Sequence, residues 1–544
     1  MLQKSYIEKL IPILKRDAKR ALKMSVPGFK RPYYCSFLLK DTEWFNTWAS
    51  SGSTYRKRND RTRNVYCDIR VGSYRYDQTS DGALFDNDKE LESYQYVTAP
   101  IDDKDYDGLR IALWRLAEAK VREAIADFNY KQAARVSTVD KNKGYPSFQR
   151  VKPVKHKVFS KKEYVDHEQW ARFCKRASKW LSQLPQVSSN FVEVDTSQST
   201  RILINTENTE VVQHEQIFSL VANIRHLNAE GSYIEQELVV NCGTQKELPD
   251  MRKFKKLMLD KYELMLRVIK AKQIHSFSGP VLLYPGPAGL LFHEAIGHRL
   301  EGNRLLSTGE GQTFKGSIGK RVVNVPVTLR DDPTLKKFDG RKCIGAYEID
   351  DEGVPAENTV LVEGGILKGF LSSRAATSKA HRSNGHARTA KYQRPISRMG
   401  VTIIEGEDPV SMDMLRDKLL QEIKDQGKPF GMIVYDTCGG ETDTSSYDFQ
   451  AFAGVIAFAT LVYPNGKEVP VRGVDFVGTP LQALNNIIAV GDELELDNGY
   501  CGAESGFIPV STISPAVLLD NLELQAKEEE LVTQFILSSP RAKN

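Results

Sequence analysis

The sequence predicts an α+β protein, in which an N-terminal mixed α/β unit precedes a β-rich C-terminal domain. Apolar residues recur three and four positions apart from Gly108 to Phe128, which is the spacing of one face of an α-helix. Apolar and polar residues alternate from Val65 to Tyr76 and in several runs between Phe191 and Val240, as they do in half-buried strands. Most segments beyond Val281 are again strand-like, so we expect two units of different character.

The chain of 544 residues with 41% hydrophobic content is long enough for two or more domains, each with its own core. Its first 20 residues mix charged side chains with Leu and Ile at helical spacing, and they lack the unbroken apolar segment of a secretory signal. No stretch approaches the roughly 18 apolar residues that a membrane span needs. We therefore expect a soluble protein without a membrane partner, which begins with an amphipathic helix.

The cysteines and the overall charge set limits on the compartment and on partners. Seven cysteines are scattered along the chain without CxxC pairs, which argues against a disulfide framework and fits a reducing cytoplasm. The net charge of +5 is small beside 75 basic and 70 acidic residues. This balance gives no indication of a nucleic-acid or membrane surface.

A basic segment from Asp140 to Lys162 lies between the predicted helix and the later strands. It is rich in Lys and Arg and holds Pro146 and Pro153, which is typical of an exposed connection. Aromatic side chains that could stack on bases are sparse there, so a solvated insertion is favoured over a nucleic-acid loop.

A long charged helix is expected from Leu248 to Lys272, and we place the domain boundary just before it, near residue 245. The N-terminal domain then spans 1–245 and the C-terminal domain 246–544. Val281 to Tyr284 reads as a short strand, which the Pro/Gly run at 285–289 breaks, and Leu290 to Leu300 has the composition of a helix.

The rest of the C-terminal domain is predicted to be mostly strand. Asn358 to Phe370 is expected to fold as a hairpin about Gly364 and Gly365. Further strand candidates are Gly431–Asp436, Ala451–Tyr463 and Val471–Val477.

The predicted helix at 290–300 contains His293 and His298, five residues apart, with Glu294 beside the first. Zinc peptidases commonly place two histidines four apart, about 40° around a regular helix, whereas five apart they stand about 140° apart. A shared metal ion therefore requires a local widening such as a π-bulge, which Gly297 would make easier. The alternative is that the three residues fell together in an ordinary helix.

A catalytic zinc needs three protein ligands and an open position for water. Glu301 lies about two turns beyond His293, too far along the axis for the same ion unless the helix ends first. Cys501 and Cys438 both lie in Gly-flanked segments, and a thiolate is a strong zinc ligand. We expect a turn at Cys501, but the spacing alone does not choose between the two cysteines, and a buried inert thiol is the usual fate of either.

Other histidines imitate part of this pattern. His214 and Glu215 repeat the His-Glu pair that begins this pattern, but no second histidine follows nearby. His381 and His386 are five apart, but basic residues crowd them and oppose cation binding.

With these motifs in hand, the chain resembles the TldD/PmbA family, whose TldD members are zinc metallopeptidases with an HExxxH helix and a distant cysteine ligand. The resemblance covers most of the C-terminal half and rests on blocks in the same order. These blocks are 293–302, 349–355, 365–369, 395–399, 435–441 and 494–502. Arg299 and Asn303 depart from the family pattern, in which a small residue and an aspartate are usual.

The resemblance implies a ligand set and a mechanism. It implies that His293, His298 and Cys501 hold one zinc ion per active chain, so that the C-terminal domain carries a metal-binding helix, and that Glu294 is the general base. It also implies flexible or unfolded peptides as substrates, and a cavity enclosed by two subunits, as a homodimer or as a heterodimer with a PmbA-like paralogue.

Three rival functions share parts of this description. A PmbA-like non-catalytic subunit would lack the metal motif, and intact His293, Glu294, His298 and Cys501 argue against it. A peptide-maturation amidase would use the same zinc site. A nucleic-acid-associated factor would use the basic insertion near 140–162 and bind DNA in a salt-dependent manner.

Overall fold

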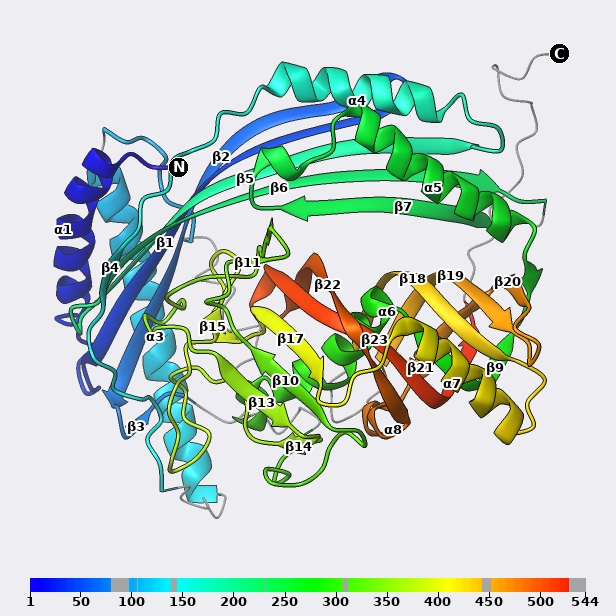
Figure 1. Cartoon of the computed structure of the whole chain (residues 1–544). Helices are drawn as coiled ribbons and strands as arrows, with labels where there is room; N and C mark the ends of the chain where they lie inside the picture. The colour runs from blue at the N-terminus through cyan, green and yellow to red at the C-terminus, as the bar shows by residue number, and fades with distance from the viewer. Residues whose placement is uncertain are drawn as a thin grey trace.

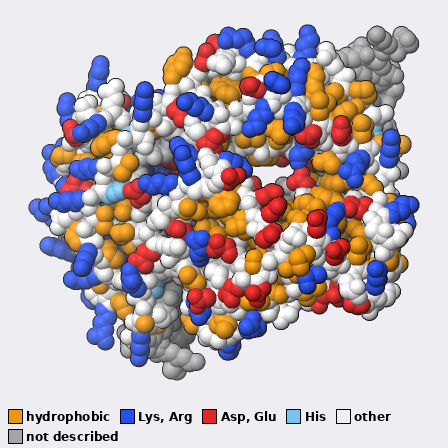
Figure 2. All heavy atoms as spheres, viewed as in Figure 1, with side chains coloured by type: hydrophobic (Ala, Val, Ile, Leu, Met, Phe, Trp, Pro, Cys, Tyr) orange, Lys and Arg blue, Asp and Glu red, His pale blue; other side chains and the backbone are white. Residues whose placement is uncertain are grey.

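Two large β-sheets dominate the computed structural model, which describes residues 1–79, 97–104, 106–137, 144–229, 231–306, 312–442 and 452–527. The N-terminal sheet curves as an arch over the C-terminal part (Figure 1). Figure 2 shows the molecule hollowed between the two. The predicted α+β class, with a β-rich C-terminal region, is confirmed.

The arch is a seven-stranded sheet in the order β3-β2-β1-β5-β6-β4, with β7 paired to β6. Long antiparallel pairs form most of it, because β1 and β2 make one hairpin and β5 and β6 another. The bounds are β1 Pro32–Ser50, β2 Ser53–Ser73, β3 Tyr76–Asp77, β4 Lys155–Lys157, β5 Ser189–Asn205, β6 Glu210–Leu227 and β7 Tyr233–Cys242.

Helices cover the convex face of the arch (Figure 1). They are α1 Lys4–Ala21, α3 Tyr106–Ser137, α4 His167–Leu181 and α5 Met251–Ile269. Side chains alternate along each strand, so Phe37 and Leu39 of β1 pack beneath the helices while Lys40 and Trp44 line the concave side. The concave side therefore carries polar and aromatic groups that face the C-terminal part.

The predictions for this half are largely confirmed. The amphipathic N-terminal helix is α1, the helix at 108–128 is the centre of α3, and the charged helix at 248–272 is α5. The strands at 201–205 and 233–240 belong to β5 and β7, and the alternation from Val65 belongs to β2 and β3. The strand β2 begins earlier than predicted, and α4 was missed.

The basic connection at 140–162 is only partly an exposed loop, and its residues 140–143 lie outside the described part of the chain. Most of the remainder is solvent-exposed, but Phe148 is buried. The guanidinium groups of Arg70 and Arg374 lie 3.5 and 4.0 Å from the centre of its ring. Phe148 also forms a β-bridge with Ala375, so the connection helps to join the arch to the C-terminal part.

A twelve-stranded sheet forms the C-terminal part, in the order β14-β13-β10-β17-β23-β9-β18-β19-β20-β8, with β21 and β22 attached to its side. Its strands are β8 Lys272–Gln273, β9 Ser276–Leu283, β10 Val327–Asp331, β13 Thr359–Glu363, β14 Ile366–Leu367, β17 Val401–Gly406, β18 Gly431–Thr442, β19 Phe452–Val462, β20 Glu468–Arg472, β21 Val474–Gly478, β22 Ile487–Ala503 and β23 Gly506–Ala526. Two small hairpins pair β11 Lys337–Phe338 with β12 Arg341–Lys342 and β15 Ala387–Arg388 with β16 Ile396–Ser397.

The strand and hairpin predictions here hold with one difference. The hairpin at 358–370 is β13–β14, and the strands at 281–284, 431–436 and 451–463 correspond to β9, β18 and β19, with residue 451 outside the described residues. The single strand expected at 471–477 is two, because Gly473 adopts a φ of 88° between β20 and β21. Helices α7 Met412–Asp425 and α8 Pro480–Asn485 were not predicted.

The helix after β9 differs from its prediction at its start. The Pro/Gly run at 285–289 ends the strand as predicted, but it is itself helical: α6 spans Pro285–Phe292, with Pro285 in the first helical turn. Proline is favoured there, because that turn has no partner for its N–H and the ring already fixes a helical φ. The π-helical turn η2 His293–Gly297 and the 3₁₀ turns η3 His298–Leu300 and η4 Gly302–Leu306 follow. Nearly every side chain from Leu291 to Leu300 is buried, so this helix lies inside the C-terminal core.

Buried ion pairs connect the arch to the C-terminal part. Arg201 of β5 donates to Asp351 over 2.8 Å, and Arg374 donates to Glu207 over 2.8 Å. Asp351 is only 4% exposed. No helix within the described ranges is long and apolar enough to cross a membrane. The boundary near residue 245, which lies between β7 and α5, remains a proposal.

Candidate metal centre

A π-helical turn brings His293 and His298 onto one side of their helix. The backbone N–H of His298 donates to the carbonyl of His293, five residues back. The two rings lie with their centres 4.9 Å apart and nearly perpendicular. The predicted local widening is therefore confirmed, and it removes the angular separation that a regular helix would impose.

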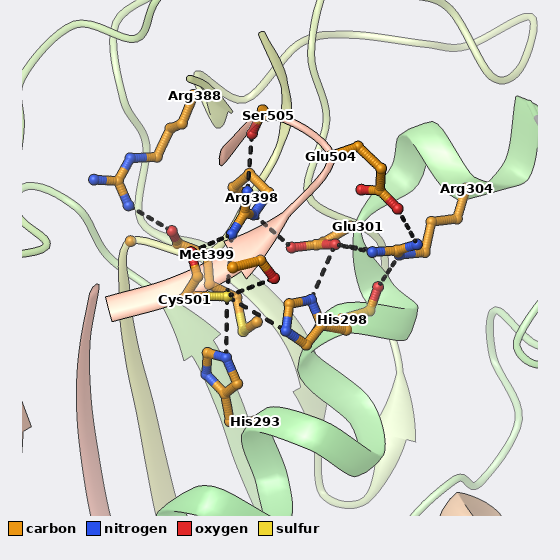
Figure 3. A network of polar contacts seen from close by, with 12 residues as sticks. His293, His298, Glu301, Arg304, Arg388, Arg398, Met399, Cys501, Glu504 and Ser505 are labelled. Atoms are coloured by element: carbon orange, nitrogen blue, oxygen red, sulfur yellow. Dashed lines mark hydrogen bonds and ion pairs between the residues drawn. The ribbon is translucent and has the colours of Figure 1, made fainter. Parts of the chain in front are cut away.

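Cys501 reaches the two histidines from a distant part of the chain (Figure 3). Its sulfur lies 3.2 Å from Nε2 of His293 and 3.3 Å from Nε2 of His298. The predicted turn at this residue is wrong: Cys501 lies in strand β22, and the turn of the β22–β23 hairpin follows at Glu504 and Ser505. Alternation along β22 turns Tyr500 into a cavity and Cys501 toward the histidines.

These three residues fit a zinc ion. Their ligand atoms all lie within 4.8 Å of one another, and they form the one group of three metal-binding side chains of this kind among the described residues. Around a tetrahedral zinc, nitrogen and sulfur ligands stand about 3.3 to 3.6 Å apart. Two imidazoles and one thiolate also leave the fourth position that a catalytic zinc requires.

The surroundings favour a thiolate at Cys501. Burial would raise the pKa of this thiol, but His298 and His293 outweigh burial and hold the pKa well below its usual range. Burial would likewise lower the pKa of His298, but Cys501 and Glu301 raise it to about 10. The cysteine is therefore already in the state that binds a metal.

Glu294 lies directly beside the cluster. Its carboxylate is 4.0 Å from Nε2 of His298 and is almost completely buried. Burial raises the pKa of Glu294 despite the neighbouring histidines, which moves this group toward the pKa of an effective base near neutral pH. Arg299 donates to the carbonyl of Glu294 over 2.6 Å and to Thr442 over 2.8 Å, so this departure from the family pattern ties the π-helical turn to β18.

Two buried groups that the sequence did not assign surround the ligands. Glu301 lies 3.2 Å from Nδ1 of His298, on the side of the ring away from Cys501, which agrees with its exclusion as a ligand. Burial would raise the pKa of Glu301, but His298 and Arg304 hold it at about 2. Arg398 donates to the sulfur of Cys501 over 3.2 Å. In the sequence, Arg398 appears only as part of the block at 395–399 that resembles the family. No pattern in the neighbouring residues predicted a role for it.

The competing candidates lie apart from the cluster. Cys438 is exposed on β18 and does not belong to the group of three. His214 contacts Ser160, and His381 contacts the carbonyl of Ser373. His386 lies 3.2 Å from the buried carboxylate of Asp331, which the sequence did not reveal as its partner.

A cavity of about 830 Å³ lies between the concave side of the arch and the C-terminal part. Trp44 and Ser197 line it from the arch, and Tyr500 and Phe507 line it from the β22–β23 hairpin. The lining does not include His293, Glu294 or His298, so the hairpin separates most of this space from the ligand cluster.

Comparison with known proteins assigns residues 276–526 to the PmbA/TldA metallopeptidase C-terminal domain. The chain is 35% identical over 260 residues to a protein named Metalloprotease from Archaeoglobus fulgidus, which covers 47% of this chain and 55% of that protein. It is 31% identical over 262 residues to the Metalloprotease TldD homolog of Buchnera aphidicola subsp. Acyrthosiphon pisum, covering 47% and 50%. The chain thus spans about half the length of these relatives.

Two further similarities concern the metal and the fold. The Zinc metalloprotease TldD homolog of Saccharolobus solfataricus is 26% identical over 247 residues, which cover 45% of this chain and 51% of that protein. The crystal structure of TldE from Thermococcus kodakarensis matches 96% of this chain and 100% of its own, with a TM-score of 0.61 and 14% identity. At this identity the structural match concerns the fold alone.

Proposed function

Because the chain belongs to the TldD/PmbA family, we propose that it is a zinc-dependent metallopeptidase, with one zinc ion per active chain bound by His293, His298 and Cys501. One observation carries the proposal: three ligand atoms from two distant segments meet within 4.8 Å of one another, beside the buried carboxylate of Glu294. The relatives named metalloproteases support the same reading.

The proposed mechanism assigns one role to each side chain. A catalytic zinc supplies Lewis acidity toward the scissile carbonyl and toward water. Glu294 accepts the proton of the attacking water and returns it to the leaving amine, because it is the carboxylate next to His293 and its raised pKa suits both steps. Glu301 holds the tautomer and the orientation of His298 through Nδ1.

We propose flexible or unfolded peptides as substrates, bound as an added strand. Between Leu494 and Ala503, β22 pairs only with β23, so among the described residues its other edge has no strand partner next to Cys501. An extended peptide can pair with such an edge through its backbone. The exposed Gly439 and Gly440 of β18 carry no side chain that would obstruct an extended chain.

We further propose that the protein acts in the cytoplasm as a dimer, with itself or with a PmbA-like paralogue. The free cysteines suit a reducing compartment, and all seven are unpaired in the structure. A two-fold contact between similar chains is the commonest way to enclose a shared cavity. Nucleic-acid binding has no support from the net charge.

The proposal is tested by measuring metal and activity together. The purified protein should contain about one zinc per chain and cleave an unstructured peptide, and a chelator should abolish the cleavage until zinc is restored. A protein that binds no zinc after reconstitution would refute the metal site. Zinc binding without cleavage of plain peptides, but with cleavage of a modified peptide, would instead favour a maturation amidase.

A further inference from the structure

Arg398 occupies the space directly behind Cys501. Its side chain is completely buried. One terminal nitrogen, Nη2, donates to the sulfur of Cys501 over 3.2 Å and to the carbonyl of the same residue over 2.7 Å (Figure 3). The other, Nη1, donates to Ser505 over 2.8 Å and to the carbonyl of Gly506 over 3.1 Å. A single guanidinium therefore holds the whole tip of the β22–β23 hairpin.

The same guanidinium connects the cysteine to the histidine side of the cluster. Its Nε lies 3.3 Å from Oε1 of Glu301. The other oxygen of Glu301 lies 3.2 Å from Nδ1 of His298 and accepts from Arg304 over 2.9 Å. The chain of contacts thus runs from the sulfur through Arg398 and Glu301 to the ring of His298.

Met399, the residue after Arg398, packs against the π-helical turn and so fixes the position of Arg398 relative to that turn. The sulfur of Met399 lies so close to Gly297 that an added Cβ there would overlap it. The carbonyl of Met399 accepts from Arg388 over 2.7 Å. Residues 398–399 therefore lie between the helix that carries His293 and His298 and the β22–β23 hairpin that carries Cys501. Their geometry depends on both elements.

We propose that Arg398 is a positioning residue of the metal centre, which aims Cys501 at His293 and His298 and withdraws electron density from its sulfur. This inference rests on the proposed function. A buried guanidinium must be compensated by charged or polar partners, and here the thiolate and Glu301 supply them. A charge-assisted hydrogen bond to a ligand atom weakens its donation to the metal, and such outer partners commonly alter metal affinity by about 10- to 100-fold.

Cobalt(II) in place of zinc gives a direct readout, because a cysteine ligand produces a charge-transfer absorption whose energy follows the electron density on sulfur. Removing a hydrogen-bond donor from the sulfur raises that density and shifts the band to longer wavelength. Arg398→Gln should show this shift and, because loss of the alignment of Cys501 outweighs the stronger donation from its sulfur, bind zinc about 10- to 100-fold more weakly in competition with a chelator. Arg304→Gln is the matched control, because Arg304 pairs with the same Glu301 and reaches Glu504 on its other side, whereas the donor to the sulfur is Arg398. Its band should keep the energy of the unsubstituted protein.

The outcomes separate this inference from the proposed function. A band that stays in place in Arg398→Gln, or that moves equally in Arg304→Gln, overturns the role of Arg398 while the metal site stands. Absence of any cysteine band in the unsubstituted cobalt protein overturns the site itself, and this inference with it. If circular dichroism shows that Arg398→Gln does not fold, Arg398→Met replaces it. The unbranched methionine side chain carries no hydrogen-bond donor for the sulfur, so the same shift is expected.

Discussion

Opposite charges face one another in the metal-free cluster, and this sets how zinc binding responds to pH. His298 has a pKa of about 10, raised by Cys501 and Glu301 against burial, and the pKa of Cys501 is well below its usual range. Near pH 7 the cluster is therefore a protonated imidazole beside a thiolate. Zinc and this proton compete for the same nitrogen of His298.

The apparent zinc affinity should rise with pH. Each displaced proton adds about a tenfold gain per pH unit while the pH lies below the pKa of His298. Titration against a competing chelator between about pH 7 and about pH 9 measures the slope, and calorimetry in two buffers counts the released protons. An affinity that does not change over this range would mean that His298 is already neutral without metal.

Replacement of Glu294 should separate metal binding from catalysis. Glu294→Gln keeps the shape of the side chain but removes the base, so zinc content should stay near one per chain while peptide cleavage falls by about 100-fold or more. Glu363→Gln, at the exposed end of β13, is a suitable control. Near-normal turnover by Glu294→Gln would remove this residue from the mechanism.

The two candidate cysteines should behave differently. Cys501→Ala leaves two neutral nitrogens, which hold zinc much more weakly than two nitrogens and a thiolate, so metal and activity should both be lost. Cys438 is exposed, so Cys438→Ala should keep the metal and change the free energy of unfolding by only about 0.5 kcal/mol. Zinc analysis of both variants decides between them, and the reverse pattern would reassign the ligand.

Some of these side chains could be predicted from the sequence and others could not, because the prediction depends on how far apart the residues lie along the chain. His293, Glu294 and His298 lie within six residues, so helical geometry alone could relate them. Cys501 is 203 residues from His298, and Arg398 is 103 residues from Cys501. Spacing says nothing about such contacts, so Cys501 required a resemblance and the role of Arg398 required the fold.

Two glycine substitutions in the helix that carries His293 and His298 should show how tightly the π-helical turn is packed. Gly297→Ala should cost about 1 to 3 kcal/mol of stability and weaken zinc binding, because the new Cβ overlaps the Met399 sulfur. Gly286→Ala, in the α6 segment of the same helix, meets nothing within 4 Å and should be neutral or stabilising by up to about 1 kcal/mol. Denaturant unfolding and zinc titration compare the pair. Equal effects would mean that Met399 moves aside freely.

The strands show where periodicity is informative and where it is not. In β2 the segment from Val65 onward alternates apolar and polar residues, and that part was predicted, although side chains on both of its faces are largely buried. The same strand from Ser53 to Asp60 is exposed on both faces, so no hydrophobic pattern marks it. Its length follows from pairing with β1 across the hairpin, which a single segment does not encode.

The contact between the arch and the C-terminal part depends on a few buried charges. Asp351 accepts from Arg201 over 2.8 Å and from the backbone of Thr389 over 2.8 Å, and Lys40 lies 3.8 Å away. Burial would raise the pKa of Asp351, but Arg201 and Lys40 hold it below its usual range. The carboxylate is therefore charged wherever the protein is folded near neutral pH.

Loss of this carboxylate should loosen the arch. Asp351→Asn leaves Arg201 and Lys40 with no opposing charge from this side chain, so we expect a loss of about 3 kcal/mol in the free energy of unfolding. Glu348→Gln removes a half-exposed acid of the same segment and should cost under about 1 kcal/mol. Denaturant midpoints of the two variants are the measurement. Similar midpoints would show that the contact between the two parts does not rely on Asp351.

The position of the arch over the C-terminal part was beyond sequence reasoning. The class of each half, mixed α/β before a β-rich C-terminal region, was predicted from the sequence. The join, however, is made by Arg201, Asp351, Arg374 and Glu207, which look like ordinary charged surface residues in a linear sequence. Only the three-dimensional pairing shows that Asp351 and Arg374 are buried and that Arg201 and Glu207 are their partners.

The alternation of Tyr500 and Cys501 on β22 limits how this segment can change during evolution. One residue gained or lost between Leu494 and Cys501 would turn the thiol into the cavity and the tyrosine toward the histidines. Substitutions in this stretch leave the thiol in place, whereas a single-residue insertion or deletion removes it from the cluster. Lineages that keep the metal should therefore vary here in composition but never in length.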